Sequence, residues 1–252
     1  MSGDRPELLR VEGLSKTFGG LRAVIDVSFG VGRDEIVGLL GPNGSGKTTV
    51  LNLIAGALRA DAGRVYLAGR DITRLAASRR TGLGIARTFQ LVRPLPSLSA
   101  LDNVLVARLY ARDRPPASQA RAESAQLLDL VGLGGKAAIP AARLTLTDRK
   151  RVEIARALAV RPAIMLLDEP LGGLNPTEVD ALLDLFRRIR RQGATLLIVE
   201  HNVRAVRALC DRVIVLNSGR EIAAGAPQET LARPEVVEIY LGAASARVEQ
   251  LT

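Results

Sequence analysis

The sequence predicts an α/β fold: a mainly parallel core sheet, an N-terminal antiparallel β subdomain and a helical subdomain. Three observations support this prediction. The first 35 residues or so alternate like strands, the middle of the chain is rich in proline and helical patterns, and apolar strands alternate with helices towards the end. With 252 residues, 47% of them hydrophobic, the chain is long enough to bury a large core. We therefore treat residues 1–252 as a single domain.

The N-terminal part is expected to form strands because β-branched and alternating side chains dominate it. Residues 8–11 and 23–29 are the clearest strands, and a turn at 18–20 lies between them. A short strand follows at 63–70. The apolar segment 35–40 forms a further strand, and a helical pattern begins shortly after it. Residues 1–90 thus hold the β subdomain and the first half of the core.

The middle of the chain, residues 71–145, is predicted to be a helical insert between two halves of the core. Several prolines occur there, and helical stretches lie near 100–110 and 117–131. A helix at 147–160 comes next. These elements place a helical subdomain at about residues 91–160.

Strands and helices alternate in residues 161–252, where the core returns. A strand at 163–167 precedes a helix that Asn175 caps, with Pro176 at its first position. Gly193 ends this helix. The remaining elements are a strand at 194–199, a helix at 203–209, a strand at 213–216 and a hairpin turn at 217–219. Such alternation implies a mainly parallel sheet.

Composition excludes several classes of function. The net charge is +9, but the charges are spread along the chain and only 3% of residues are aromatic, so we expect no nucleic-acid partner. No window approaches the ~18 apolar residues of a membrane span, and the N-terminus lacks an apolar signal core. The single cysteine, Cys210, rules out an internal disulfide and suits a reducing cytosol.

Residues 41–48 form a complete phosphate-loop motif, G-x-x-x-x-G-K-[ST], between the strand at 35–40 and a helix. Its glycines let backbone N–H groups turn towards phosphate oxygens. Lys47 would reach the β- and γ-phosphates, and the Thr48 hydroxyl would ligate Mg²⁺. The residues predicted to bind the nucleotide here are Gly41, Asn43, Gly44, Ser45, Gly46, Lys47, Thr48 and Thr49.

Acidic residues at the end of the strand 163–167 supply the next chemical groups. Asp168 would hold Mg²⁺, directly or through water, and Glu169 lies where a carboxylate can polarise the attacking water. His201, the only histidine, follows a second core strand, which favours contact with a γ-phosphate. Gln90 by itself is a weak signal.

Together, these motifs resemble the ATP-binding subunit of an ABC transporter over essentially the whole chain. The resemblance implies that Phe18 stacks on adenine, that Gln90 senses Mg²⁺ and the membrane partner, and that Glu169 is the catalytic glutamate. It also implies that Asp168 is the metal aspartate and His201 the switch histidine. Residues 173–175 stand where the family has its inter-subunit loop. The catalytic set is thus Lys47, Gln90, Glu169 and His201, and the metal set is Thr48, Gln90 and Asp168.

The resemblance also implies cofactors, partners and location. ATP and Mg²⁺ would bind, and the chain would form a homo- or heterodimer with a second ABC ATPase. It would lie peripherally on the cytoplasmic face of the cell membrane, on permease subunits that receive solute from a periplasmic or extracellular binding protein. A permease helix would dock on the apolar, proline-stiffened segment 91–98.

Four segments are similar to the larger ATPase of branched-chain amino acid uptake systems: 18–24, 86–90, 173–178 and 233–242. This likeness implies import of leucine, isoleucine or valine. Other amino acids, amides and urea remain alternatives.

One motif departs from the family pattern. The signature, commonly Leu-Ser-Gly-Gly-Gln, aligns with residues 144–148, where Thr145 keeps a hydroxyl and would face the partner's ATP. Leu146 and Thr147 replace two glycines that allow close approach to phosphate. Asp148 brings a carboxylate to the place where a γ-phosphate should dock, and the basic residues 149–151 would offset its charge.

Three readings follow from this departure and from the other motifs. The first is a hydrolytic subunit that powers import. The second is an ATP-gated subunit with weak hydrolysis, which the altered signature favours and Glu169 and His201 oppose. The third is an ABC ATPase that acts on DNA or ribosomes. It is disfavoured because the chain has no room for a long coiled coil before the signature and carries a single ATPase half.

Overall fold

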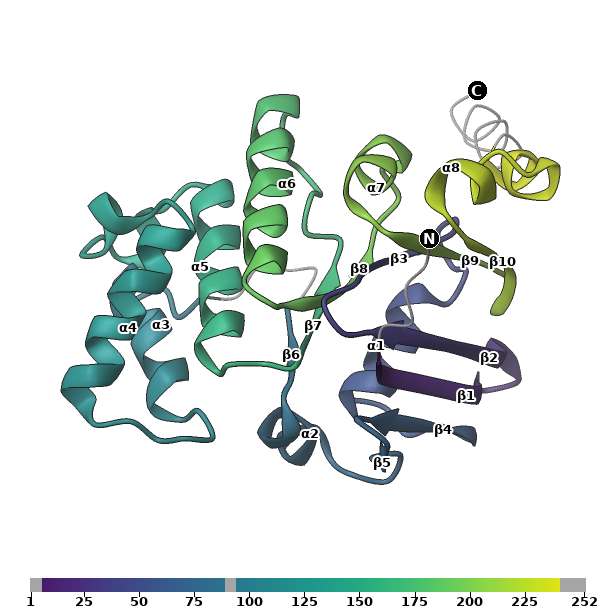
Figure 1. Ribbon diagram of the computed structural model, residues 1–252, viewed down its shortest axis with the longest axis horizontal. Coiled ribbons are helices and arrows are strands. Elements are labelled where there is room, and N and C mark those ends of the chain that lie inside the picture. Colours follow the sequence, from purple (N-terminus) through teal and green to yellow (C-terminus); the bar gives the residue numbers. More distant parts are fainter. Residues whose placement is uncertain (1–5, 89–93, 241–252) are drawn as a thin grey trace.

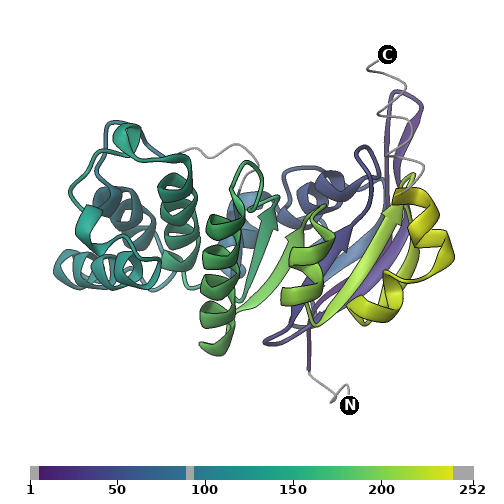
Figure 2. The ribbon, with the colours of Figure 1, turned by 90° about the horizontal axis from the view of Figure 1, so that it is seen from above.

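The computed structural model describes residues 6–88 and 94–240, and these form two sheets and a helical layer (Figure 1). One sheet has four strands in the order β2-β1-β4-β5, and the other has six in the order β10-β9-β3-β8-β7-β6. The helical layer lies at one end of the molecule, beside the β6 edge of the larger sheet, as the view from above also shows (Figure 2). The predicted fold class is confirmed.

The smaller sheet is the N-terminal antiparallel subdomain. Its strands are β1 (Glu7–Phe18), β2 (Leu21–Gly32), β4 (Ala62–Leu67) and β5 (Arg70–Asp71). β1 and β2 form a hairpin whose turn is Gly19-Gly20, and both glycines have positive φ. One face of the hairpin packs over α1 (Lys47–Ala55), so this helix lies between the two sheets.

The larger sheet is mainly parallel, as predicted. Strands β3 (Ile36–Leu40), β8 (Thr195–Val199), β7 (Ile164–Asp168) and β6 (Ile85–Arg87) pair in parallel, and β9 (Arg212–Asn217) joins β3 in the same direction. Every residue of β3, β7 and β8 is buried, which explains their continuous apolar runs. Only β10 (Arg220–Gly225) is antiparallel. It follows a two-residue turn in which Ser218 and Gly219 both have positive φ, as a type I′ hairpin requires.

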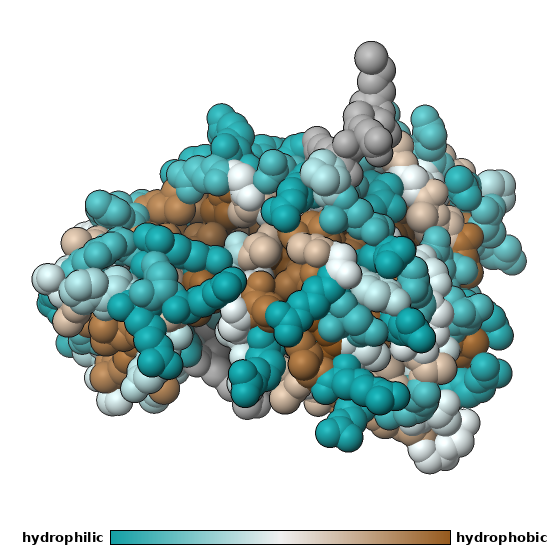
Figure 3. Space-filling view, turned by 60° about the horizontal axis from the view of Figure 1, so that its bottom comes forward, coloured by the Kyte–Doolittle hydropathy of each residue, from teal (hydrophilic) through white to brown (hydrophobic). Residues whose placement is uncertain are grey.

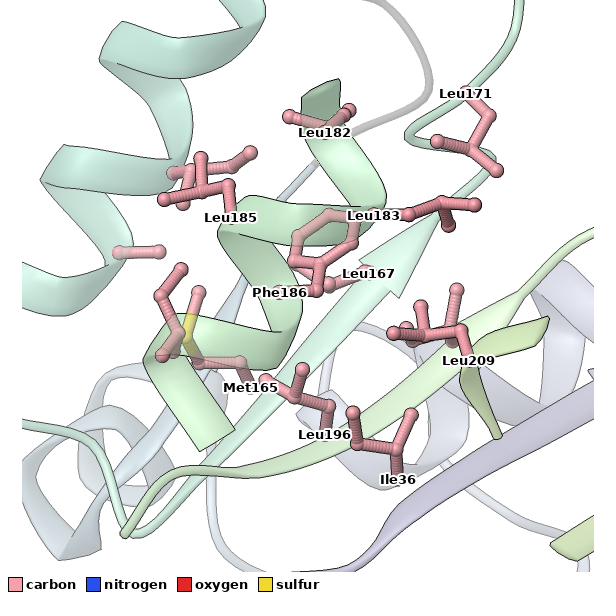
Figure 4. Close-up of a cluster of buried hydrophobic side chains, with 14 of the residues drawn as sticks. Ile36, Met165, Leu167, Leu171, Leu182, Leu183, Leu185, Phe186, Leu196 and Leu209 are labelled. Atoms are coloured by element: carbon pink, nitrogen blue, oxygen red, sulfur yellow. The ribbon is translucent and has the colours of Figure 1, made fainter. Parts of the chain in front are cut away.

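Helices cover both faces of this sheet. Alternate residues of β7 point to opposite faces, so Leu166 packs with the α1 cluster and Met165 with α6 (Pro176–Arg191). Figure 4 shows Phe186 and its neighbours on α6 pointing towards β7 and β8. Asn175 caps α6 in a reciprocal capping box with Glu178, which confirms the predicted start of the helix. The remaining C-terminal helices are α7 (Val203–Leu209), α8 (Pro227–Thr230) and a helical stretch at 234–240.

The helical layer consists of α3 (Ala100–Leu109), α4 (Ala117–Leu130) and α5 (Leu146–Ala159), with short 3₁₀ turns at Gly134–Lys136 and Ala141–Arg143. The prediction that this insert begins at residue 71 is wrong. Helix α2 (Ala77–Leu83) leads into β6, which pairs with β7 in the core sheet. A three-residue strand is too short to show periodicity, so the sequence concealed it.

Two further expectations concern the chain as a whole. In the described part of the chain, no helix combines the length and apolar character needed to cross a bilayer. Cys210 is a free, buried thiol, and burial raises its pKa to about 12.

Candidate active site

The phosphate loop connects β3 to α1, and three of its residues need glycine. Gly41, Gly44 and Gly46 all have positive φ, at 148°, 79° and 100°. A Cβ at Gly41 would lie 2.1 Å from the Leu216 carbonyl oxygen, and one at Gly46 would lie 2.4 Å from that of Ala23. At Gly44 a Cβ would meet no atom within 4 Å. Two glycines therefore let the loop pack closely on its neighbours, and the third leaves an open side for a ligand.

Lys47 begins α1 and extends back across this loop. Its ammonium donates to the carbonyl oxygens of Gly41 and Pro42, each at 2.8 Å, and the residue is only 5% exposed. Burial lowers the pKa of Lys47, and the nearby carboxylates of Asp168 and Glu169 act in the opposite direction. A buried cation thus lies across a glycine-rich loop at the start of a helix, a combination that suits phosphate.

Thr48 and Asp168 bring two oxygen ligands together. The Thr48 hydroxyl donates to Asp168 Oδ1 at 3.3 Å, although the two residues come from α1 and the end of β7. Asp168 is 2% exposed, and its other oxygen accepts from Arg87 Nη2 at 3.0 Å. A hydroxyl and a carboxylate are oxygen donors of the kind that bind Mg²⁺ together with substrate phosphates.

Glu169 follows directly, in a strained conformation. Its φ is 47°, a value that non-glycine residues rarely adopt, and its N–H donates to the Val199 carbonyl at 3.0 Å. Lys150 of α5 donates to the next carbonyl, that of Pro170, at 2.9 Å, and burial lowers the pKa of this lysine. The turn that presents Glu169 is therefore fixed from both β8 and the helical layer.

His201 lies one residue beyond a buried carboxylate that sequence reasoning missed. Glu200 is 1% exposed, and it accepts the backbone N–H groups of Leu171 at 2.8 Å and His201 at 3.2 Å. Burial raises the pKa of Glu200, and these hydrogen bonds oppose the rise. The His201 side chain is 58% exposed and open to a ligand. An acidic residue directly after the apolar run 196–199 was the available signal for Glu200.

The other predicted ligands lie around the loop. Phe18 is 43% exposed at the end of β1, with the Lys16 ammonium 5.5 Å from its ring centre. Asn43 is exposed, and the Ser45 hydroxyl is buried without a hydrogen-bond partner among the described residues. Thr49 is half-buried on α1, and Gln90 lies outside the described residues. Lys47, Thr48, Asp168 and Glu169 therefore lie close together in the structure. The contacts that join these four do not involve Phe18, Asn43, Ser45, Thr49 or His201.

The altered signature lies at the start of α5 and is occupied by contacts within the chain. Thr145 caps the helix by accepting the Asp148 N–H at 3.2 Å. Asp148 is 6% exposed and pairs with the Lys136 ammonium at 2.6 Å. The expectation that residues 149–151 offset its charge is therefore corrected: Lys136 does so, and Lys150 instead bonds to Pro170.

Thr147 joins the signature to the start of α6. Its hydroxyl donates to Glu178 Oε1 at 2.5 Å, while Glu178 Oε2 accepts the Asn175 N–H at 3.0 Å. Leu146 remains 40% exposed, and a Cβ at Gly173 would lie 3.2 Å from its Cδ2 atom. The segments 144–148 and 173–178 therefore contact each other within this subunit.

A glycine loop between β3 and α1, with an aspartate and a glutamate at the end of β7, two strands further along the same sheet, defines a phosphate-loop nucleoside triphosphatase. The model of the ABC transporter family matches residues 24–172, and the chain belongs to this family. It is an ATP-binding subunit with the ATPase fold, and the resemblance found in the sequence is confirmed.

Individual relatives cover nearly the whole chain. The chain is 38% identical over 251 residues to the high-affinity branched-chain amino acid transport ATP-binding protein LivG of Salmonella typhimurium, with 94% of this chain and 98% of the relative covered. It is 40% identical over 236 residues to the lipopolysaccharide export system ATP-binding protein LptB of Acidithiobacillus ferridurans, with 94% and 97% covered. A crystal structure of an ABC transporter ATP-binding cassette in its ADP conformation superposes with a TM-score of 0.86 at 33% identity, with 94% and 99% covered.

Proposed function

We propose that this chain hydrolyses ATP to power the import of branched-chain or other hydrophobic amino acids through a membrane permease. The observation that carries the hydrolytic part is the convergence of Lys47, Thr48, Asp168 and Glu169. The cargo rests on the likeness to LivG over almost the full length of both chains. Amides and urea are the alternative cargo, and an ATP-gated subunit with weak hydrolysis is the alternative mechanism.

Binding of ATP and Mg²⁺ would use groups already in place. Lys47 is buried at the loop and would exchange its two carbonyl partners for β- and γ-phosphate oxygens. Phe18 would stack on adenine. Thr48 and Asp168 fit Mg²⁺ because their oxygen atoms converge, and Gln90, outside the described residues, would bind the same metal. Bound Mg²⁺ neutralises charge on the phosphates.

Hydrolysis would use the residues beyond β7 and β8. The Glu169 carboxylate would accept a proton from the attacking water. Hydrogen bonds to Val199 and from Lys150 hold its strained turn in place. His201 would contact the γ-phosphate through its exposed ring. Release of inorganic phosphate, measured on the purified protein or its complex, separates this mechanism from ATP-gated binding without turnover.

A dimer completes this arrangement. The signature would serve the ATP bound by a second ABC ATPase, with Thr145 facing that nucleotide, and the partner's signature would serve the ATP bound here. The dimer is either a homodimer or a heterodimer, and it would lie on the cytoplasmic face of the membrane.

The permease would dock between the core and the helical layer. A groove of about 370 Å³ lies there, with small apolar side chains from α1, α2, α3 and α5 on its walls and Glu153, Arg156 and Arg87 as polar groups. Figure 3 shows apolar residues in the hollow between the two parts of the molecule. We propose that a short permease helix fits this groove, whose lining includes none of the described residues of the segment 91–98 that the sequence predicted to receive it. Residues 91–93 of that segment lie outside the described residues.

The test of cargo is the ATPase rate of the complex reconstituted with its permease and solute-binding protein. Stimulation by leucine-loaded binding protein supports the proposal. Stimulation by an amide, urea, or an unrelated solute alone would overturn the amino-acid cargo and leave the ATPase intact. Stimulation by lipopolysaccharide without any binding protein would favour the export role of the LptB relative.

A further inference from the structure

Arg87 connects three elements of the core, and the proposed hydrolytic mechanism gives it no role. It ends β6, and its side chain is 10% exposed. Its Nη2 donates to Asp168 Oδ2 at 3.0 Å, and its Nη1 donates to Asn52 Oδ1 at 2.5 Å. The planar guanidinium thus bridges the end of β7 and the helix of the phosphate loop. Arginine suits this position because its fork of donors can hold two acceptors at fixed angles.

Three hydrogen bonds link Thr48, Asp168, Arg87 and Asn52 in that order. Thr48 and Asn52 are four residues apart on α1 and therefore lie on the same face of the helix. Thr48 bonds to Asp168 Oδ1, while Asn52 holds the arginine that bonds to Oδ2. The two carboxylate oxygens are therefore divided, one facing the Thr48 hydroxyl and the other facing Arg87.

The division of these oxygens has a mechanical consequence. A carboxylate that is 2% exposed needs hydrogen-bond donors on both oxygens, or it turns towards whichever donor remains. With Arg87 on Oδ2, Oδ1 stays beside Thr48, the other oxygen donor assigned to Mg²⁺. Removing a group that orients a metal-binding carboxylate commonly lowers metal affinity by roughly 10–100-fold.

We propose that Arg87 is a positioning residue for the metal site: it keeps Asp168 Oδ1 beside the Thr48 hydroxyl, where these two oxygens would hold Mg²⁺. This inference rests on the proposed role of Thr48 and Asp168 as metal ligands. If Arg87 acted through its charge alone, it would compete with Mg²⁺ beside Asp168, and the experiment separates the two effects.

Arg87 also lines the groove between the core and the helical layer. Whatever packs into that groove touches the side chain that orients Asp168. The metal site and the groove therefore share one residue.

The experiment is calorimetric titration of purified protein with adenylyl imidodiphosphate, a non-hydrolysable ATP analogue, in Mg²⁺ and in EDTA. The dissociation constant in EDTA divided by the dissociation constant in Mg²⁺ measures how much the metal strengthens binding. In Arg87→Met we expect this ratio to fall roughly tenfold, the usual effect of losing a group that orients a metal ligand, while affinity in EDTA stays within about twofold. Asn52→Ala, which removes only the anchor of Arg87, should lower the ratio by a smaller factor.

Controls and contrary outcomes keep the inference distinct from the proposed function. Arg79→Met removes a positive charge from an exposed position on α2, and it should leave the ratio unchanged. An unchanged or increased ratio in Arg87→Met would overturn the positioning role. If that variant does not fold, an unchanged ratio in Asn52→Ala overturns it equally. Absence of any Mg²⁺ effect in the unmodified protein would instead refute the metal site, and the inference with it.

Discussion

The phosphate loop and the signature segment are both short loops that open a helix, yet they present different groups to a ligand. In the first, glycines shape the backbone and leave an open side at Gly44, with Lys47 held across the loop. In the second, Thr145 caps its own helix and Asp148 pairs with Lys136. Both segments therefore keep the helix start, and only the phosphate loop keeps its backbone open to phosphate.

Leu146 and Thr147 stand where the family's usual signature has two glycines, and the structure shows what these side chains do. Thr147 uses its hydroxyl to bond Glu178, so the signature is tied to the segment that begins α6. Asp148 adds negative charge at a helix N-terminus, where it stabilises the helix and opposes the approach of phosphate. These contacts hold the signature segment within the subunit, and we expect them to make it less suited to binding an anion.

The largest expected effect concerns the nucleotide site built around the phosphate loop. Glu169→Gln should keep ATP binding and reduce hydrolysis by ~10²–10⁴, the usual contribution of a general base. The amide fits the same turn but is a poor proton acceptor. Phosphate release is the measurement, with Glu229→Gln as the control because Glu229 is an exposed acid on α8. Hydrolysis at the wild-type rate would leave Glu169 with a structural role only.

Lys47→Ala tests the loop itself. Because the β- and γ-phosphates would lose their buried cation, ATP affinity should fall by roughly 10–100-fold, corresponding to about 1.5–3 kcal/mol for a hydrogen bond to a charged group. Calorimetric titration with ATP is the measurement. Equal affinity in the variant and the wild type would show that the loop binds phosphate through its backbone alone.

The two segments also differ in how far the sequence predicts them. The phosphate loop could be assigned because its glycines, Lys47 and Thr48 lie within eight consecutive residues, and positive φ demands glycine there. The order of most strands and helices could also be predicted from the sequence. The short strand β6 was not, because three residues show no period.

Side-chain pairing is the part that the sequence does not encode locally. Arg87 and Asp168 meet only because β6 and β7 are neighbours in the sheet. The same holds for Lys136 and Asp148, which the 3₁₀ turn before α5 brings together. Charge alone suggested the wrong partner for Asp148: Lys150, close to it in sequence, bonds to the Pro170 carbonyl instead.

In a heterodimer, the phosphate loop and the altered signature of this chain would serve two different ATP molecules, so their effects could be measured separately. If the partner carries the usual signature, the ATP bound by this chain faces intact glycines, whereas the partner's ATP faces Leu146, Thr147 and Asp148. Glu169→Gln should then remove most of the ATPase activity of the complex, and the equivalent change in the partner should remove much less. Equal losses from the two changes would contradict this asymmetry.

The smallest expected effect concerns the ion pair that occupies the signature. Burial raises the pKa of Asp148, but hydrogen bonds from Lys136 and Thr145 outweigh it, so the pKa in the folded state lies below the ordinary value. A lowered pKa stabilises the fold above the unfolded value of ~3.9, and the stabilisation is lost as pH falls through the folded value.

Lys136→Met should therefore lower the free energy of unfolding by about 1 kcal/mol or less at pH 7, since Lys136 is 46% exposed and solvent screens the pair. The loss should shrink as Asp148 becomes protonated below its folded pKa. Urea denaturation over a series of pH values measures this, with Lys136→Arg as the control that keeps the charge. A loss that is independent of pH would mean that Lys136 acts through packing, and the carboxylate of Asp148 would then be stabilised mainly by its position at the start of α5.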